Sequence, residues 1–504
     1  MEHYDVAIIG AGFGGLACAL TLAQRGQKVV LFERLTYPGG CASTFVRRGY
    51  RFESGATLFC GFHRQQLFHR WIESFGLDVV FQPLDPILTL RSEEFTLDVP
   101  SERERLVDEF CALPGAPKKR LRDFFDWQRT IADALWDCFA DPDLLPPLGV
   151  RNLARHFLRA PRYLRLARLV GTPLGEVLRR HQLWDYLPFR TYANALCQIT
   201  VQTDANSAEA PFALGAMDYF FRGTGHIHGG IGVLARALSE QITVLGGNVK
   251  FAEPVWRLID TDRGWEIETR RDKYSARQVV ANTLPANLAD LLGKPVDDIS
   301  RLSHLHEQVT RGWGAAMLYL GVDASKISNP CAHHLQLIDS TNKPLREGNH
   351  IFCSVSGADE PDRSPSGERT ATVSTHVDMG RLWTKNPREQ AEYVAAVQHR
   401  MRRTLERRAP DLWEAVCFEM TASPRTFERF TNRRRGYVGG IPRTAGLHNY
   451  RHLSPYEVHD GLYLVGDTVF PGQSVLAVAL GGVRVAEAIA PAKSSHRIRH
   501  HAAT

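Results

Sequence analysis

Residues 4–34 read YDVAIIGAGFGGLACALTLAQRGQKVVLFER, and the rest of the chain is best understood from them. The apolar run at residues 6–9 predicts a buried parallel strand. Apolar positions spaced by three and four in residues 16–23 predict a helix that ends at Gly26. A second strand is expected at residues 28–32. The turn between the first strand and the helix has the spacing G-x-G-x-x-G, formed by Gly10, Gly12 and Gly15.

This strand–turn–helix–strand arrangement is typical of a dinucleotide site. Gly10 permits the tight turn, Gly12 lets the backbone approach a pyrophosphate, and Gly15 lets helix and strand pack closely. The helix N-terminus would face the negative charge. Glu33 ends the second strand about twenty residues beyond the turn, where its carboxylate would accept hydrogen bonds from a ribose diol and disfavour the 2′-phosphate of NADP. The glycine spacing alone also fits an ordinary βαβ unit, but the strand, helix and terminal acid together favour a dinucleotide.

The composition is that of an ordinary globular protein. The 504 residues are enough for two or three domains, each with its own core. The apolar fraction of 44% and the charged fraction of 23% are unremarkable for such proteins. A net charge of +6 is mild over this length, so we expect no nucleic-acid partner.

The cysteines and the termini indicate neither a metal site nor export. The nine cysteines are scattered without a C-x-x-C pair, so we expect no zinc site and no disulfide framework. A reducing, cytoplasmic location is the default expectation. The N-terminal apolar residues lack a basic lead-in, so we expect no signal peptide, and no apolar run is long enough to span a bilayer. The tail from Ala492 contains histidines but is expected to be a frayed terminus without a metal role.

The pattern along the chain predicts an α/β protein whose Rossmann-like dinucleotide-binding domain is discontinuous. Residues 101–225 are rich in Arg, Leu and Pro and predict a helical insertion, or lid. At residues 291–452, several strands precede one long helix and predict an α+β substrate domain with an antiparallel sheet. Residues 493–504 are expected to form a flexible tail. The three parts of the dinucleotide-binding domain are expected at residues 1–100, 226–290 and 453–492.

One segment of the insertion could touch a membrane. Residues 151–170 read RNLARHFLRAPRYLRLARLV, with leucine and phenylalanine near the face opposite the arginines. Such a basic amphipathic helix can lie in an anionic membrane interface. A solvated basic face on a core-packed helix fits the pattern equally well, and only a lipophilic substrate would favour the membrane. The arginines at helical spacing are Arg151, Arg155, Arg159 and Arg162.

Two glycine-containing loops near the N-terminus are candidate ligand contacts. The loop YPGGCAST at residues 37–44 has two adjacent glycines after a proline, so its backbone can lie against a flat or anionic ligand. GYRFESGATLF at residues 49–59 predicts a short strand in which Glu53 and Ser54 could touch the ligand, although a surface hairpin fits equally well.

The closing stretch, GLYLVGDTVFPGQSVLAVALGGVRVAEAIA at residues 461–490, predicts a second ligand-binding turn. A strand stops at Gly466 and Asp467, and a helix with many small residues is expected at residues 474–489. The positive N-terminus of that helix suits the pyrimidine edge of a reduced flavin, and Asp467 suits a ribityl or ribose hydroxyl. The basic loop NRRRGYVGG at residues 432–440 could face a cavity or solvent. We expect solvent for at least part of its arginine run, because three adjacent charges are costly to bury.

These motifs together resemble the carotenoid desaturase and isomerase family of FAD-dependent, amine-oxidase-like oxidoreductases. The resemblance rests on the opening stretch, the PGG loop, GYRFESGAT, the closing stretch and the middle segment GGIGVLARAL…VKFAEPVWRL. SPRTFERFT at residues 423–431 and RRRGYVGGIP at residues 433–442 look most like the carotenoid 3,4-desaturase and isomerase branches. Relatives often carry Asp at the position of Glu53, which is a conservative difference.

The resemblance implies a cofactor, FAD, and residues that hold it. The adenosine half would be held by Gly10, Gly12, Gly15, Glu33 and Arg34. The pyrophosphate and the flavin side would be lined by Gly39, Gly40 and Ala42. Val255 would contact the adenine through its backbone, and Gly466 and Asp467 would close the site. Under or beside the flavin would lie Pro471, Gly472 and Val475.

The resemblance also implies a lipophilic polyene that enters an apolar tunnel from a peripheral membrane surface. Desaturation would transfer a hydride to flavin N5, with loss of a proton from the neighbouring carbon. The sequence offers only His226 and His228 as candidate proton acceptors, and a structural role fits each of them better. Cis-trans isomerisation with reduced FAD is the nearest alternative. Further alternatives are a carotene ketolase, a soluble amine or porphyrinogen oxidase, and a non-enzymatic lipid escort protein, although the intact glycines and Asp467 weigh against the last.

Overall fold

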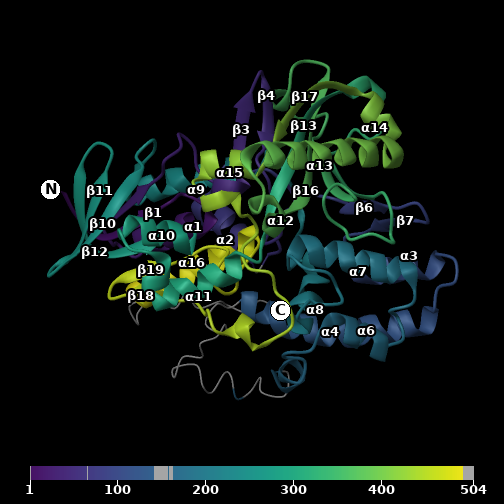
Figure 1. Ribbon diagram of the computed structural model, residues 1–504, viewed down its shortest axis with the longest axis horizontal. Helices are drawn as coiled ribbons and strands as arrows, with labels where there is room; N and C mark the ends of the chain where they lie inside the picture. Colours follow the sequence, from purple (N-terminus) through teal and green to yellow (C-terminus); the bar gives the residue numbers. More distant parts are fainter. Residues whose placement is uncertain (1, 65, 141–156, 158–162, 492–504) are drawn as a thin grey trace.

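The computed structural model describes residues 2–64, 66–140, 157 and 163–491. Figure 1 shows two sheets next to each other, with a group of helices, α3 to α8, beneath the second sheet. Within the described ranges, no helix has both the length and the apolar character needed to cross a bilayer. The predicted α/β class with a Rossmann-like domain is confirmed.

The first sheet is built from the apolar runs at the start of the chain. Its central strand β1 (Glu2–Ile9) pairs in parallel with β2 (Val29–Phe32), and α1 (Phe13–Gln24) connects them. Successive residues of β1 enter different cores, because side chains alternate between the faces of a strand. Val6 and Ile8 pack with α1, whereas Ala7 and Ile9 pack on the other face. Both faces are therefore covered, as a parallel sheet requires.

The two ends of the chain meet in this sheet. β12 (Lys273–Ala281) lies between β1 and β19 (Leu462–Leu464) and pairs in parallel with both. Ala281 is opposite Ile9 on one side and Leu464 on the other, so the turns that follow β1 and β19 lie at one edge. The remaining strands are β9 (Asn248–Lys250) beside β2, the meander β10 (Val255–Thr261) and β11 (Gly264–Thr269) beside β12, and β18 (Tyr456–His459) beside β19.

Helices α1, α9 (Ile231–Val244) and α16 (Val475–Ile489) cover one face of the first sheet. Small residues let α1 and α16 approach closely. A Cβ atom on Gly482 would overlap the carbonyl oxygen of Gly14. The other face is covered by α10 (Pro285–Leu291) and α11 (Ser300–Val309).

The second sheet has the strand order β17-β13-β16-β15-β14-β6-β7 and carries the long helix α13 (Pro387–Arg408). It is antiparallel except where β14 pairs with β6. Its strands are β6 (Leu88–Arg91), β7 (Thr96–Val99), β13 (Trp313–Asp323), β14 (His333–Ile338), β15 (His350–Val355), β16 (Glu368–Asp378) and β17 (Val416–Ala422).

The hairpin β6–β7 differs from its predicted place. It lies within residues 1–100, which the sequence predicts to be cofactor-binding, but it extends the second sheet through β14. The short alternating pattern of this hairpin predicts that its residues form strands. It does not predict which strand they pair with, because that strand, β14, lies more than 200 residues further along the chain. We therefore propose a domain division in which this hairpin joins the second sheet. Two small two-stranded antiparallel sheets lie apart from both large sheets: the hairpin of β3 (Thr44–Arg47) with β4 (Tyr50–Glu53), and the long-range pair of β5 (Phe81–Pro83) with β8 (Gly225–Ile227).

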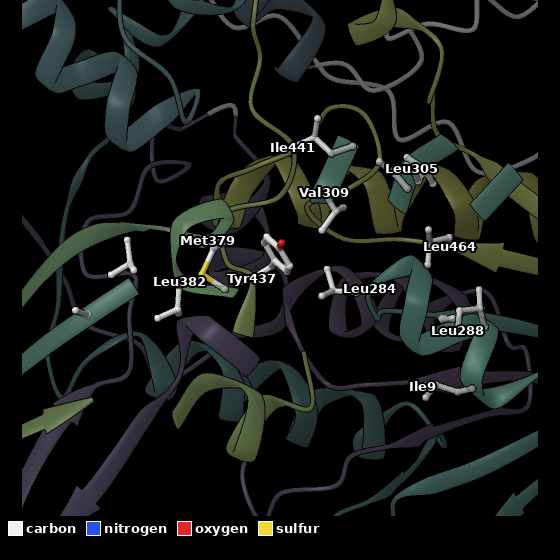
Figure 2. Packing of buried hydrophobic residues seen from close by; sticks show 14 of the residues in the cluster. Ile9, Leu284, Leu288, Leu305, Val309, Met379, Leu382, Tyr437, Ile441 and Leu464 are labelled. Atoms are coloured by element: carbon white, nitrogen blue, oxygen red, sulfur yellow. The ribbon is translucent and has the colours of Figure 1, made fainter. Parts of the chain in front are cut away.

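The core shared by the two sheets is continuous. Figure 2 shows Ile9 and Leu464 from the first sheet, Leu288 from α10 and Met379 from α12 (Met379–Trp383) in one buried cluster. Tyr437 lies among them, so the loop after α15 (Pro424–Thr431) is fixed between the sheets. This packing places that loop beside the turn that follows β19.

The helices between residues 101 and 225 share one hydrophobic core with strands β6, β7, β14 and β15 of the second sheet. The described helices of this segment are α3 (Arg103–Ala112), α4 (Lys118–Ala140), α6 (Leu174–Arg180), α7 (Leu187–Thr200) and α8 (Ala210–Ala216), and α2 (Leu67–Phe75) precedes them beside α16. The arginines of the proposed membrane-facing helix, Arg151, Arg155, Arg159 and Arg162, lie outside the described residues.

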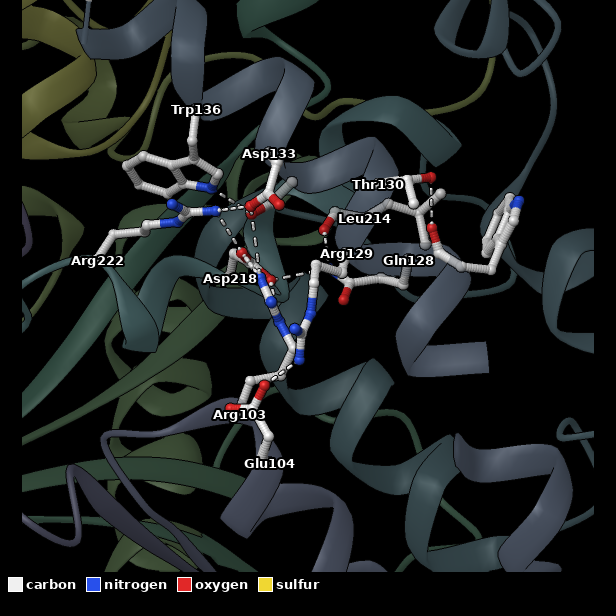
Figure 3. A network of polar contacts seen from close by, with 12 residues as sticks. Arg103, Glu104, Gln128, Arg129, Thr130, Asp133, Trp136, Leu214, Asp218 and Arg222 are labelled. Carbon is white, nitrogen blue, oxygen red and sulfur yellow. Dashed lines mark hydrogen bonds and ion pairs between the residues drawn. The ribbon is translucent and has the colours of Figure 1, made fainter. Parts of the chain in front are cut away.

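A buried carboxylate links these helices. Asp218, which is fully buried, accepts hydrogen bonds from Arg103 of α3, from Gln128 of α4 at 3.0 Å and from Arg222 at 2.8 Å (Figure 3). Two cations and an amide thus share one acceptor, which satisfies charges that would otherwise be costly to bury.

Candidate functional site

A single cavity of about 900 Å³ extends from the first sheet to the helical segment. Its lining combines backbone-rich turns of the first sheet with side chains of the second sheet and of the helices. The turns come from both ends of the chain, because β12 brings them together. The predicted site residues on this lining are Gly10, Gly12, Glu33, Arg34, Gly39, Gly40, Ala42, Val255, Gly466, Asp467, Pro471 and Val475.

The glycine turn forms an open cradle at the start of α1. Gly10 has φ +94°, a left-handed conformation that favours glycine, and Gly12 is the N-cap of α1 but has no side chain to cap it. The first N–H groups of α1 therefore remain available to a ligand. A Cβ on Gly12 would lie 2.7 Å from Asn282 Nδ2 and would fill this space. Gly15 is not on the cavity lining, because its missing Cβ instead lets α1 pack against the carbonyl of Gly10.

Glu33 is held in place at the end of β2. Its carboxylate accepts hydrogen bonds from the backbone N–H groups of Ala11 at 2.8 Å and Leu35 at 2.9 Å. Burial raises the pKa of Glu33, while these two bonds oppose the shift. The side chain is 8% exposed and borders the cavity together with Arg34. A fixed carboxylate at this point suits a ribose diol.

The C-terminal turn completes the cradle. Gly466 has φ +114°, and a Cβ there would lie 2.9 Å from Asn282 Oδ1. Asp467 lies on the lining and accepts a hydrogen bond of 2.8 Å from Arg433. Pro471 and Val475 also border the cavity at the start of α16, whereas Gly472 lies behind them, where a Cβ would overlap the guanidinium of Arg443.

The three arginines that follow α15 do not all face the cavity, as the cost of burying three adjacent charges predicts. Arg434 is exposed and pairs with Asp290, so part of the run does face solvent. Arg433 is the exception, because its charge is offset by Asp467 and its Nε donates to the carbonyl of Tyr437 at 2.6 Å. Both Arg433 and Asp467 border the cavity.

His226 and His228 are not among the residues that line the cavity. His226 is buried and its Nε2 lies 2.8 Å from a carboxylate oxygen of Glu360. Burial alone would raise the pKa of Glu360, but the hydrogen bond and the charge of His226 lower it to about 2. His228 is partly exposed, 3.5 Å from Asp359. Both histidines thus have carboxylate partners outside the cavity.

Several lining residues have no counterpart in the sequence prediction. Asn282 follows β12, and its Nδ2 donates to the carbonyl of Gly10 at 3.3 Å. The sequence around it gives no sign of the contact, which depends on the parallel pairing of β12 with β1. The others are Arg433, Arg443, Gln202 and His376. Apart from the glycine–arginine loop for Arg433, no local motif marks them.

The far wall of the cavity is apolar and aromatic. It comes from α4, from the end of the 157–170 segment and from α8 with the residues that follow it. Phe352 of β15 contributes from the second sheet. This wall offers few groups to a charged ligand and suits a long hydrophobic one. It includes Leu135, Trp136, Phe139, Leu166, Phe212 and Tyr219.

A flavin or other dinucleotide cofactor fits the residues present. The uncapped N-terminus of α1, the fixed carboxylate of Glu33 and the glycine turns are each open toward the cavity. In the described part of the chain, no cluster of three His, Cys, Asp or Glu side chains has a metal-binding arrangement.

Comparison with known proteins agrees with this geometry. Residues 8–75 match the family model described as an NAD(P)-binding Rossmann-like domain. The chain is 27% identical to the chloroplastic prolycopene isomerase of Arabidopsis thaliana, over 97% of this chain and 82% of that protein. It is 25% identical to the neurosporene-forming phytoene desaturase of Rhodobacter capsulatus, over 96% of this chain and 93% of that protein.

Over nearly its full length the chain is similar to carotenoid desaturases and isomerases. The resemblance inferred from its motifs is confirmed, and the chain is an enzyme. Among solved structures, putrescine oxidase bound to putrescine superposes with a TM-score of 0.65 at 14% identity, over 97% of this chain and 99% of that one. At this identity the likeness shows a shared fold, that of an amine oxidase. The chain is thus similar in sequence to carotenoid desaturases and isomerases, and similar in fold to an amine oxidase.

Proposed function

We propose that the chain is an FAD-dependent carotenoid desaturase that introduces a C=C bond of the C-3′,4′ type. One observation carries the proposal: a single cavity is lined at one end by a dinucleotide cradle and at the other by an apolar wall. A reacting polyene carbon and a flavin can therefore share one water-poor space. Bound FAD would supply the hydride acceptor, flavin N5. The 3,4-type assignment rests on the motifs at residues 423–442.

The proposal gives each part of the cradle a role. The N-terminus of α1, with Gly10 and Gly12, would hold the pyrophosphate, and Glu33 would bind the adenosine ribose. Val255 and Arg34 border the adenine end. Asp467, already oriented by Arg433, would accept a hydrogen bond from the ribityl chain. Along the flavin would lie Gly39, Gly40, Ala42, Gly466, Pro471 and Val475.

We also propose that the polyene enters from a membrane surface to which the cytoplasmic enzyme binds peripherally. Tyr163 and Leu166 line the cavity, while Leu164 between them is 63% exposed. Phe157, on the same segment, is 80% exposed. Large exposed apolar side chains beside an apolar cavity are suited to contact with lipid.

Cis-trans isomerisation with reduced FAD is the second candidate. It is favoured by the full-length similarity to prolycopene isomerases, and the same cradle and apolar wall would serve it. An oxidase of small soluble amines is less consistent with the apolar wall.

Expression in a bacterium that accumulates lycopene or a monocyclic carotene separates the two candidates. We expect the extracted pigment to absorb at longer wavelength, because each added double bond lengthens the conjugated system. A pigment of unchanged chain length with altered cis bands would establish isomerisation instead. A pigment that does not change with any carotenoid tested would contradict both.

A further inference from the structure

Two polar side chains, Gln202 and His376, interrupt the cavity wall between the cradle and the apolar end. Gln202 follows α7 and is 4% exposed, and His376 is half-buried on β16. Of the histidines in the described ranges, His376 is the one that lines the cavity. Its Nε2 lies 3.1 Å from the amide nitrogen of Gln202.

Gln202 is held in this place from two sides. Its φ of +62° is left-handed, a strained conformation for a residue with a side chain, and such strain concentrates at functional sites. The indole N–H of Trp313 donates to its carbonyl at 2.7 Å. Gly439 leaves room for its amide, because a Cβ there would lie 2.6 Å from the amide carbon. These contacts fix Gln202 through its backbone carbonyl and through packing of Gly439 against its side-chain amide.

The amide of Gln202 is not fully satisfied by the protein. Its Oε1 is buried and has no hydrogen-bond partner among the described residues. By turning about its last bond, the amide can present either NH2 or oxygen to His376 Nε2. With the oxygen toward Nε2–H, the lone pair of His376 is on Nδ1, and the imidazole can accept a proton there while Gln202 stabilises the imidazolium.

The surroundings keep His376 neutral. Burial lowers its pKa to about 4, so at neutral pH the ring can accept a proton. His350 of the neighbouring strand β15 interacts electrostatically with His376, and burial lowers the pKa of His350 to about 3. Glu347 donates its backbone N–H to the carbonyl of His376 while its carboxylate binds Tyr393, and Arg346 stacks on the Trp313 ring that also packs against His376.

We propose that His376 is the proton acceptor of the desaturation and that Gln202 positions it. The inference rests on the proposed function. One substrate C–H bond gives up its hydrogen with both electrons, as a hydride that bound FAD would accept. The neighbouring C–H bond then breaks, its electron pair forms the new C=C bond, and its proton goes to His376 Nδ1. The imidazolium returns the proton to solvent after product release.

Two variants test the proposal in the flavin-loaded enzyme. His376→Gln should slow the lengthening of the chromophore by about 10²- to 10⁴-fold, the contribution of a positioned base, while polyene binding is unchanged. The exposed His399 of α13 provides the matched control, and His399→Gln should retain the rate. Rates are counted per bound flavin, so partial loss of cofactor does not affect them.

Gln202→Glu tests the pairing of Gln202 with His376 through the pH dependence of kcat, which a purely structural residue would not shift. A carboxylate beside His376 favours the imidazolium, so the pKa of the base rises. The acid limb of the kcat profile, where the neutral base is lost, should therefore move to higher pH by about one unit or more. An unmoved limb, or a His376→Gln rate within about threefold of the parent, would overturn the role of His376. A parent enzyme that never lengthens the chromophore would instead overturn the proposed function.

Discussion

Gly482→Ala should leave the enzyme almost without flavin and lower its free energy of unfolding by about 3 kcal/mol, at the upper end for an overpacked core. A Cβ at this position would overlap the carbonyl oxygen of Gly14 and lie 3.0 Å from the backbone nitrogen of Cys18. Both atoms are backbone, so the clash cannot be relieved by a side-chain rotation. Helix α1 must move away from α16, and the cradle between their N-termini would open.

Gly481→Ala is the matched control for this change, because the two glycines are neighbours on α16. At position 481 a Cβ would make only ordinary contact, 3.7 Å from Pro471 Cδ. We therefore expect Gly481→Ala to keep its flavin and its thermal midpoint. Flavin absorbance per protein and thermal unfolding measure both effects. Equal flavin content in the two variants would show that the close approach of α1 and α16 does not shape the site.

Asp218→Ala should destabilise the protein by about 3–5 kcal/mol, the usual cost of removing one partner of a buried ion pair. Asp218 has no exposed surface, and Arg103, which it binds, is 11% exposed at its side chain. The substitution removes the buried carboxylate that two guanidinium groups and the amide of Gln128 share (Figure 3). Gln128 then keeps the carbonyl of Leu214, and the two guanidinium groups keep the exposed Asp133. The apolar wall of the cavity, part of which is carried by α4, should loosen with it.

Asp133 offers a control from the same network. Its side chain is 51% exposed and pairs with Arg103 and Arg222 at the surface. Asp133→Ala should therefore cost less than about 1 kcal/mol, as is usual for exposed ion pairs. Denaturant unfolding of both variants makes the comparison. A similar loss of stability for the two substitutions would mean that burial of Asp218 is not what makes this network important.

Those parts of the fold and of the site that depend on residues close together in the chain could be predicted from the sequence. The glycine turn at residues 10–15 and the apolar runs on either side of it predict a βαβ unit, and the closing stretch predicts the strand and helix that meet it. In both, spacing and residue type determine the conformation. Composition predicts the helical insertion, and the pattern of residues 291–452 predicts one long helix, which is α13 at Pro387–Arg408.

Contacts between distant segments could not be predicted in this way. Asn282 reaches Gly10 only because β12 pairs in parallel with β1, and the charge of Arg433 is offset at the cavity only because Asp467 lies beside it. His376 has no motif around it, since an alternating strand does not reveal which face borders a cavity. The converse holds for His226 and His228, which are candidate proton acceptors in the sequence but pair with Glu360 and Asp359 outside the cavity.

The central claim is that a flavin and a polyene react with each other inside this one cavity. The most direct measurement is a single turnover without oxygen, in which the flavin-loaded protein is mixed with a carotene and both spectra are followed together. We expect the oxidised flavin absorbance to fall at the same rate as the polyene absorbance shifts to longer wavelength, one flavin per new double bond. A polyene spectrum that lengthens while the flavin stays oxidised, or a flavin that bleaches while the polyene is unchanged, would contradict the account.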